Sequence, residues 1–234
     1  MTPPGVPLFA LDAVTLEVGG TALVADVSLT VPDGGITVLQ GPSGSGKTTV
    51  LRLLNRLDVP TSGTVRFRGD PVDGLDPLVL RRRVGMVFQR PTPFPGTVRD
   101  NLRVADPDAD DAALVDALDA AGLPTGFLDR AADDLSGGER QRMCLARTLV
   151  TDPEVLLMDE PTSSLDPGTR THLEATARRL ADGGRPVVWV THDPAQADRL
   201  ADERIVLVDG HVATPSERER YLSGSGGEGG GRRG

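Results

Sequence analysis

Short apolar runs alternate with turn residues through the first part of the chain. Between residues 8 and 40, runs rich in β-branched residues are separated by the turn sequences GG and PDGG. From residue 47 the pattern changes, because the apolar positions of KTTVLRLLNRL recur at the spacing of one helix face. The pattern predicts strands and hairpins, forming an antiparallel β-subdomain, that lead into a helix.

Buried-type strands dominate the remainder of the chain. The runs GTVRF, RVGMVF, EVLLMD, PVVWVT and RIVLV are short and apolar, and segments with helical periodicity separate most of them. Such alternation is typical of a largely parallel sheet with helices on its faces. No apolar strand run occurs between Gln89 and Leu135, so residues of about 90–150 are predicted to form a helical insertion off the main sheet.

One α/β domain accounts for the ordered part of the chain. The chain has 234 residues, of which 38% are hydrophobic, which is enough for one domain with a sizeable core. The predicted domain covers residues 8–212. Residues 213–234 are predicted to be a C-terminal segment, whose Gly-rich end at 223–234 cannot bury apolar surface and is expected to be disordered.

Composition limits which partners the protein can bind and in which compartment it is expected. A net charge of −9 argues against binding of nucleic acid through a broad basic face, so no nucleic-acid partner is expected. The single cysteine, Cys144, excludes an intramolecular disulfide and suits a reducing compartment. The sequence shows neither a signal peptide nor a run long enough to span a membrane. We therefore expect a cytoplasmic protein whose membrane role, if it has one, comes from a partner.

Lys47 is the only lysine of the chain, although Lys and Arg together number 25. It lies in GPSGSGKT, residues 41–48, which matches a phosphate-binding loop between a predicted strand and a predicted helix. A lysine presents a compact charge on a flexible stem to the phosphates, where a planar guanidinium is bulkier. Backbone N–H groups of the loop and the helix N-terminus bind phosphate oxygens, and the Thr48 hydroxyl can ligate Mg²⁺. The predicted nucleotide-binding residues here are Gly41, Pro42, Ser43, Gly44, Ser45, Gly46, Lys47, Thr48 and Thr49.

Two carboxylates end the apolar run EVLLMDE, residues 154–160. Asp159 is predicted to hold Mg²⁺ through water, and Glu160 to polarise the water that attacks the phosphate. Without the glycine loop, this segment would read as a strand that ends in a solvated acidic turn. With it, the sequence predicts a nucleoside triphosphate site with the groups needed for hydrolysis.

The segment LSGGERQR, residues 135–142, resembles the signature of the ATP-binding cassette (ABC) family. A Ser-Gly-Gly at the start of a helix offers N–H groups and a hydroxyl to an anion. The resemblance implies that ATP binds between two subunits, with the lysine loop of one facing Ser136, Gly137 and Gly138 of the other. It therefore implies a homodimer or pseudo-dimer of ATPase subunits.

Three further residues match motifs of this family in the expected order. The resemblance implies that Gln89, in MVFQRP, contacts Mg²⁺ and water and faces the transporter's membrane subunit. It implies that Asp166, in SSLD, belongs to a loop that crosses the dimer interface, and that His192, in WVTHD, contacts the γ-phosphate. The resemblance covers residues 8–212 and implies the P-loop ABC ATPase fold.

The activity implied is that of the ATP-binding and ATP-hydrolysing subunit of a membrane transporter. Its partner would be a transmembrane permease subunit, with the ATPase peripheral on the cytoplasmic face of the membrane. The alternative from another class is a soluble ABC ATPase in DNA repair, chromosome organisation or translation. Those proteins usually carry coiled coils, zinc modules or two cassettes, and none of these fits in 234 residues.

Two resemblances bear on the transported substrate. Residues 83–102, with the run QRPTPFP, resemble the corresponding stretch of phosphate-import ATPases. The short helical insertion and VVWVTHD also resemble cassettes paired with a metal (iron) efflux membrane protein. An importer would work with an extracytoplasmic substrate-binding protein, whereas an efflux pair would not.

The chain departs from the family at the residue expected to stack on adenine. Alignment of VTLEVGG with the family pattern places Val18 where an aromatic residue is common, and residues 10–66 contain no Phe, Tyr or Trp. We therefore expect weaker discrimination between ATP and GTP than in relatives that have the aromatic ring.

Overall fold

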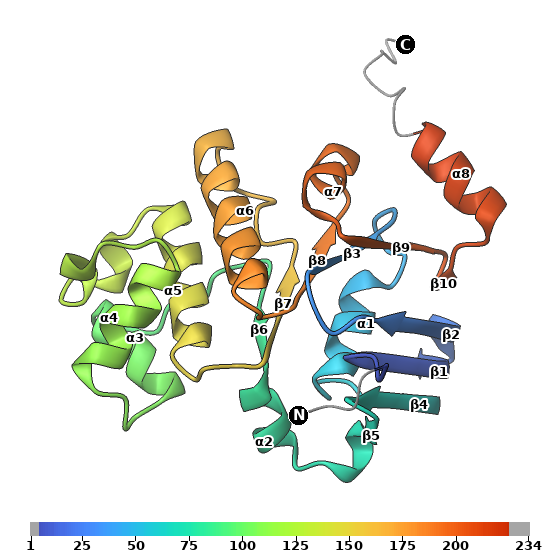
Figure 1. The fold of residues 1–234 in the computed structure, drawn as a ribbon, viewed down its shortest axis with the longest axis horizontal. Coiled ribbons are helices and arrows are strands. Elements are labelled where there is room, and N and C mark those ends of the chain that lie inside the picture. Colours follow the sequence, from blue (N-terminus) through green and yellow to red (C-terminus); the bar gives the residue numbers. More distant parts are fainter. Residues whose placement is uncertain (1–4, 225–234) are drawn as a thin grey trace.

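The computed structural model describes residues 5–224, in which strands and helices alternate (Figure 1). The strands are β1 (Phe9–Val18), β2 (Thr21–Val31), β3 (Ile36–Gln40), β4 (Ser62–Phe67), β5 (Asp70–Pro71), β6 (Val84–Val87), β7 (Val155–Asp159), β8 (Val187–Thr191), β9 (Glu203–Val208) and β10 (His211–Val212). The helices are α1 (Lys47–Leu54), α2 (Pro77–Arg83), α3 (Val98–Ala105), α4 (Asp111–Ala120), α5 (Gly137–Leu149), α6 (Pro167–Asp182), α7 (Pro194–Leu200) and α8 (Pro215–Gly224). Short 3₁₀ turns lie at Val72–Gly74, Thr125–Phe127 and Ala132–Asp134.

Two sheets form the centre of the molecule. The first has the strand order β2-β1-β4-β5 and is antiparallel. The second has the order β10-β9-β3-β8-β7-β6, and its strands are parallel except for β10, which pairs antiparallel with β9 at one edge. The predicted fold class is confirmed: a mostly parallel core sheet with an N-terminal antiparallel β-subdomain.

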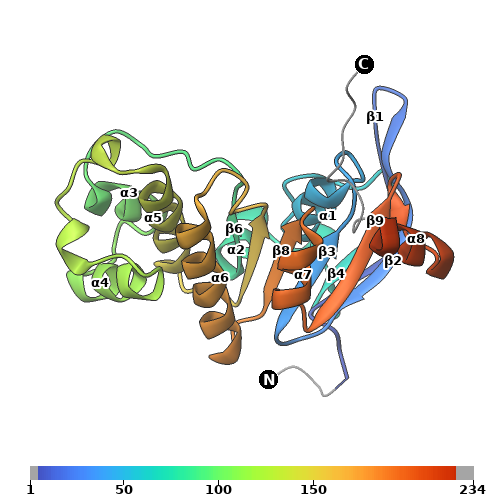
Figure 2. The same ribbon diagram turned by 90° about the horizontal axis from the view of Figure 1, so that it is seen from above.

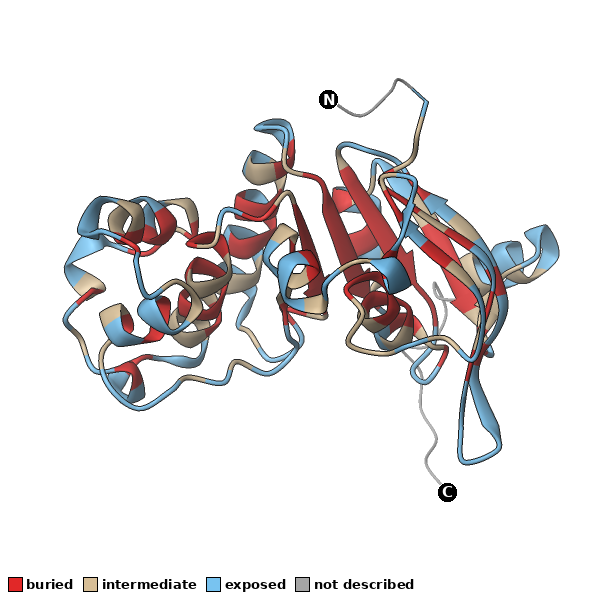
Figure 3. Ribbon diagram, turned by 90° about the horizontal axis from the view of Figure 1, so that it is seen from below, coloured by how far each residue is buried: buried red, intermediate tan, exposed pale blue. Residues whose placement is uncertain are grey.

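Both faces of the parallel sheet are buried, as Figure 3 shows. Alternate residues of its central strands point to opposite faces, because side chains of a strand alternate sides. Trp189 of β8 packs with the apolar side chains of α3–α7, whereas its neighbour Val190 packs with α1 and the antiparallel sheet. Helix α1 therefore lies between the two sheets, and the loop before it starts at the end of β3.

Helices α3 and α4 both pack on α5 at one end of the molecule (Figures 1 and 2). They occupy the stretch in which the sequence predicts a helical insertion. Helix α3 begins at a capping box, in which Thr97 and Asp100 exchange hydrogen bonds between side chain and backbone. This lobe carries the Ser-Gly-Gly turn at the start of α5.

The C-terminal segment contains a helix. The predicted disordered stretch 223–234 is wrong at its first two residues, because Ser223 and Gly224 are the last residues of α8. The remaining residues, 225–234, lie outside the described part of the chain. Among residues 5–224, no helix combines the length and the apolar character needed to cross a membrane.

Candidate active site

The loop between β3 and α1 leaves no room for a side chain at two of its glycines. Gly41 and Gly46 have φ angles of 153° and 93°, which side-chain-bearing residues rarely adopt. A Cβ atom on Gly41 would lie 2.0 Å from the carbonyl oxygen of Leu207, and one on Gly46 would lie 2.7 Å from Cγ1 of Val24. The loop is thus pressed against β9 and β2, and its conformation depends on the absence of side chains.

The Lys47 side chain lies inside this loop and is 5% exposed. Its Nζ donates to the carbonyl oxygens of Gly41 at 2.9 Å and of Pro42 at 2.7 Å. Burial lowers the pKa of Lys47, and the nearby charges of Glu160 and Asp159 oppose that shift. The single lysine of the chain therefore has a fixed place among the loop carbonyls.

Asp159 and Thr48 meet at the end of β7. The Thr48 hydroxyl donates to Oδ1 of Asp159 at 2.9 Å. Burial raises the pKa of Asp159, and this hydrogen bond opposes the shift. A hydroxyl and a carboxylate on neighbouring elements form the hard oxygen set that Mg²⁺ prefers, so these residues suit that ion.

Glu160 and His192 follow the neighbouring parallel strands β7 and β8. Nδ1 of His192 lies 3.1 Å from Oε2 of Glu160. Glu160 has a φ angle of 41°, an unusual value for a residue with a side chain. The residue after β7 is therefore held in a left-handed conformation beside the residue after β8.

A cleft of about 670 Å³ joins several of these residues. Gln89 also reaches this cleft, and its Nε2 donates to Oγ of Ser163 at 3.4 Å. The predicted residues that line the cleft are Ser43, Gly44, Gly46, Lys47, Thr48, Thr49, Gln89 and Glu160.

The sequence did not predict five residues that line the same cleft. They are Thr21, Ala22, Leu23, Asp209 and Gly210. The Asp-Gly pair is a turn signal, and Gly210 accepts a backbone hydrogen bond from Ala25 at 2.8 Å. Nothing along the chain indicates that this turn lies against the glycine loop.

Ser136, Gly137 and Gly138 open α5 in a second cluster. Ser136 and Glu139 form a capping box: Oγ of Ser136 accepts from the Glu139 N–H at 3.3 Å, and Oε2 of Glu139 accepts from the Ser136 N–H at 2.7 Å. These hydrogen bonds lower the pKa of Glu139. Gly138 touches Thr169 so closely that a Cβ atom would lie 2.5 Å from Cγ2 of Thr169.

Asp166 belongs to this second cluster. It caps α6, because its Oδ1 accepts from the Thr169 N–H at 3.0 Å. Hydrogen bonding from the side chain of Thr169, and then from its N–H, lowers the pKa of Asp166. Of the described residues that line the 670 Å³ cleft, none comes from the Ser-Gly-Gly turn or from Asp166. Helices α5 and α1 lie on opposite sides of β7 and β8 (Figures 1 and 2), so the structure separates these predicted residues from the Lys47 loop.

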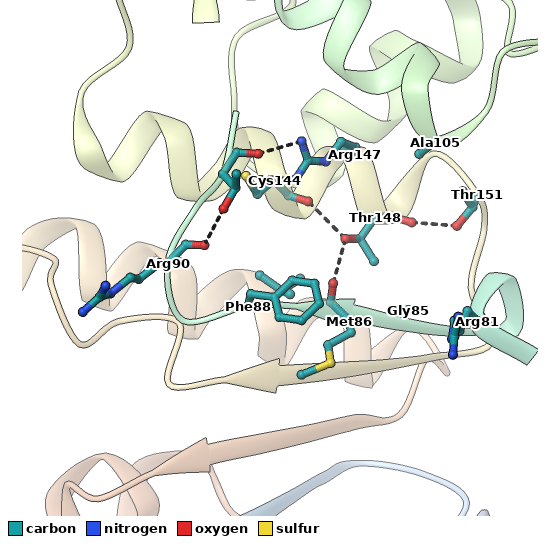
Figure 4. A pocket seen from close by; sticks show the side chains of 12 residues that line it. Arg81, Gly85, Met86, Phe88, Arg90, Ala105, Cys144, Arg147, Thr148 and Thr151 are labelled. Carbon is teal, nitrogen blue, oxygen red and sulfur yellow. Dashed lines mark hydrogen bonds between the residues drawn. The ribbon is translucent and has the colours of Figure 1, made fainter. Parts of the chain in front are cut away.

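A smaller cleft, of about 230 Å³, lies between β6 with its following loop and α5 (Figure 4). Arg147 of α5 donates to the carbonyl oxygen of Thr92 at 3.0 Å, and its guanidinium lies 4.8 Å from the ring centre of Phe94. The buried Asn101 donates to the Phe94 carbonyl at 2.9 Å. The loop that carries Gln89 is thereby fixed to the helical lobe, while Phe88 and Phe94 remain 48% and 42% exposed.

Comparison with known proteins places these features in a family. A family model described as ABC transporter matches residues 24–163. A phosphate import ATP-binding protein, PstB 2 of Mycobacterium tuberculosis, is 42% identical over 234 residues, covering 93% of this chain and 84% of that protein. Protein STAR1 of rice is 45% identical over 210 residues, and its alignment spans 86% of this chain and 60% of the rice protein.

Solved structures agree on the fold. The cbiO1 subunit of the Clostridium perfringens ABC transporter complex cbiONQ superimposes with a TM-score of 0.83 at 24% identity, covering 94% of this chain and 92% of that one. A bacterial Atm1-family ABC exporter with ATP bound gives a TM-score of 0.78 at 29% identity, covering 92% of this chain and 40% of the exporter. The chain therefore belongs to the ABC transporter family, of which it is an ATPase subunit.

Proposed function

We propose that this chain binds ATP and Mg²⁺ in the 670 Å³ cleft and that ATP-driven closure of a dimer powers phosphate import through a separate membrane subunit. The phosphates would lie in the loop 41–48, whose carbonyls already hold the Lys47 ammonium. Lys47 would turn from these carbonyls to phosphate oxygens, while loop N–H groups and the start of α1 supply further donors.

Thr48, Asp159 and Gln89 would hold Mg²⁺ beside the phosphates, Asp159 through water. Thr48 and Asp159 are in contact at 2.9 Å, and Gln89 lines the same cleft. Among residues 5–224, no cluster of three or more His, Cys, Asp and Glu side chains could hold a metal alone. This suits an ion whose other ligands are substrate and water. When bound, the ion neutralises charge on the phosphate oxygens.

Glu160 would act as the general base. One of its oxygens, Oε2, is held by Nδ1 of His192, and the carboxylate lies in the cleft with Lys47. Glu160 would accept a proton from the attacking water, and His192 would keep the carboxylate in place and contact the γ-phosphate. Gln89 would orient the same water from the other side of the cleft.

A second copy of the chain would complete the site. Ser136, Gly137, Gly138 and Asp166 lie together but away from the cleft of their own chain. Ser136 and Gly137 are exposed where the turn opens a helix, so the turn can offer donors to a nucleotide bound by another subunit. We therefore assign these residues to the facing side of a dimer.

The membrane partner would dock beside the Gln89 loop. The cleft in Figure 4 is lined by arginines and by the exposed ring of Phe88, and it adjoins the loop that also reaches the 670 Å³ cleft. A movement of α5 against β6 would shift Gln89 and so couple the cleft of Figure 4 to the 670 Å³ cleft. The chain would then lie on the cytoplasmic face of the membrane, bound to a transmembrane permease subunit.

Phosphate as the substrate rests on the relatives named phosphate import ATP-binding proteins, at 42% identity over 93% of this chain. An importer of this kind would also work with an extracytoplasmic substrate-binding protein. No observation here favours nucleic acid as a partner.

Affinity purification from native membranes tests the assignment. The tagged Glu160→Gln chain would be purified with ATP and Mg²⁺, and its partners identified by mass spectrometry. A phosphate permease is the expected partner. A metal-efflux membrane protein would overturn phosphate as the substrate, and recovery of soluble partners alone would overturn the transporter role.

A further inference from the structure

A buried polar network joins the segments that follow strands β7 and β8. Its centre is Gln196 of α7, which is 2% exposed. Nε2 of Gln196 donates to Oγ1 of Thr162 at 2.9 Å and to Oε1 of Glu174 at 2.8 Å, and its Oε1 accepts from Nε1 of Trp189 at 3.3 Å. One amide thus connects β8, the loop after β7, and helix α6.

The partners of Gln196 fix the orientation of its amide. The indole of Trp189 can only donate, and an ionised Glu174 can only accept. Glu174 is 7% exposed, and Arg199 offsets its charge through Nε at 3.1 Å and NH2 at 2.9 Å. A reversed amide would leave a donor facing Trp189 and an oxygen facing Glu174, so only one arrangement satisfies the network.

This network connects the same two segments as the Glu160 and His192 contact. Thr162 lies two residues after Glu160, and Gln196 lies four residues after His192. Between His192 and Gln196, Asp193 caps α7 and its Oδ2 lies 3.4 Å from NH1 of Arg170. The exposed contact of 3.1 Å between His192 and Glu160 is therefore held in place by the buried network around Gln196.

We infer that Gln196 is a positioning residue for ATP hydrolysis, which holds His192 against Glu160 by fixing α7 to Thr162 and Glu174. The inference rests on the proposed roles of Glu160 and His192. Hydrolysis depends on the placement of these groups, whereas the glycine loop that binds phosphate lies on another segment. Loss of the network should therefore lower kcat and leave nucleotide affinity unchanged.

Gln196→Glu tests this in the full chain, with ATP hydrolysis and equilibrium ATP binding measured side by side. The new carboxylate can still accept from Trp189 and Thr162 but faces the carboxylate of Glu174. We expect kcat to fall by about tenfold or more, with the dissociation constant for ATP unchanged. Gln196→Met, which removes the polar group without adding charge, should give the same split.

Exchanging the amide and the carboxylate between positions 196 and 174 should restore the lost activity. Gln196→Glu combined with Glu174→Gln again places an amide donor opposite a carboxylate, and it should recover most of the lost kcat. Thr176→Val is the matched control, because Thr176 is fully buried on the same helix as Glu174, and this change should leave kcat unchanged.

The outcomes separate the two claims. Absence of ATP hydrolysis by the wild-type chain would contradict the proposed function itself. If the wild-type chain hydrolyses ATP, an unchanged kcat in both Gln196 variants would overturn the inference alone. The inference would also be overturned if the Gln196 variants lost ATP affinity and kcat equally and the double change Gln196→Glu with Glu174→Gln did not restore them.

Discussion

Two glycine turns open helices in this chain, and they are built differently. The turn before α1 is pressed against β2 and β9, needs positive φ angles, and holds a buried lysine. The turn before α5 is exposed, and its serine is closed into a capping box with Glu139. The first lies near Asp159 and Glu160 at the end of β7, whereas Ser136 and Gly137 of the second are exposed.

We propose that only the first turn binds a nucleotide within its own chain, and the neighbours of the two turns explain why. The Lys47 loop brings donors and a cation into one cleft with the carboxylate of Glu160, the residue after β7, and Asp159 contacts Thr48 nearby. The Ser136 turn brings donors and a hydroxyl, but among residues 5–224 none of those that line this cleft belongs to that turn. We propose that the first turn forms a site within its own chain and that the second completes a site of another molecule.

Removal of the lysine should have the largest effect. We expect Lys47→Ala to weaken ATP binding by about 100-fold or more and to abolish hydrolysis, because the loop loses its cation. Lys47→Arg is the matched variant: a guanidinium cannot occupy the buried space in which Nζ contacts both Gly41 and Pro42. It should also bind ATP poorly in isothermal titration, and wild-type affinity in this variant would contradict our explanation of the single lysine.

Glu160→Gln should separate binding from chemistry. The amide keeps the size of the carboxylate but cannot accept the proton of water, so kcat should fall by about 1,000-fold while ATP affinity is retained. Phosphate release and equilibrium binding measure the two quantities. Normal turnover in this variant would exclude Glu160 as the general base.

Ser136→Arg should leave the first turn intact and disable the second. We expect ATP binding to the monomer to be unchanged and hydrolysis to fall by about 100-fold, because a large side chain would occupy the facing surface of the dimer. Ser216→Arg, at an exposed serine in the first turn of α8, is the control and should have no effect. Loss of monomer binding in Ser136→Arg would show that the two turns act within one chain.

An aromatic ring at position 18, three residues before Thr21 of the 670 Å³ cleft, should increase the preference of this cleft for adenine. Val18 is 60% exposed, and among the described residues lining the cleft there is no aromatic ring. In competition binding we expect ATP and GTP to differ by less than about tenfold in the wild-type chain. Val18→Tyr should raise ATP affinity by about threefold to tenfold through stacking. A strong ATP preference in the wild-type chain would count against this.

The smallest effects concern thermal stability. They have opposite signs for Asp159, near the first turn, and Asp166, near the second. Burial raises the pKa of Asp159, so the folded protein favours the protonated carboxyl. The free energy of unfolding therefore falls as pH rises through the raised pKa and Asp159 ionises. Without nucleotide and Mg²⁺, Asp159→Asn should raise Tm near neutral pH by about 2 to 4 °C, and the gain should disappear in acid.

Asp166 should behave in the opposite way. Its hydrogen bonds from Thr169 lower its pKa, so its ionised form stabilises the fold, and this contribution is lost as pH falls through the lowered pKa. Asp166→Asn should therefore lower Tm slightly at neutral pH and change nothing in acid. Equal Tm shifts in the two variants would contradict the contrast between the turns.

Much of the first turn could be predicted from the sequence, because its signals are local. Short runs of consecutive residues contain the glycine spacing, the lysine and the apolar strand before Asp159. Helix α8 also had a local signal that was missed: Thr214 and Glu217 form a capping box with Pro215 at the first helical position.

Other features depend on tertiary contacts that no local pattern encodes. The Asp209–Gly210 turn reaches the 670 Å³ cleft only because β9 and β3 are neighbours in the sheet. Gln196 meets Thr162 and Glu174 only once β7, β8 and α6 are packed. The left-handed φ angle of Glu160 likewise follows from its position after β7 and not from its residue type.

The central claim, that the Ser136 turn completes a site in a second chain, is tested most directly by the mass of the Glu160→Gln protein in solution. Light scattering with ATP and Mg²⁺ would be measured with and without the added Ser136→Arg change. We predict a dimer for Glu160→Gln alone and an ATP-bound monomer when Ser136→Arg is added. A monomer in the first case, or a dimer in the second, would contradict the account.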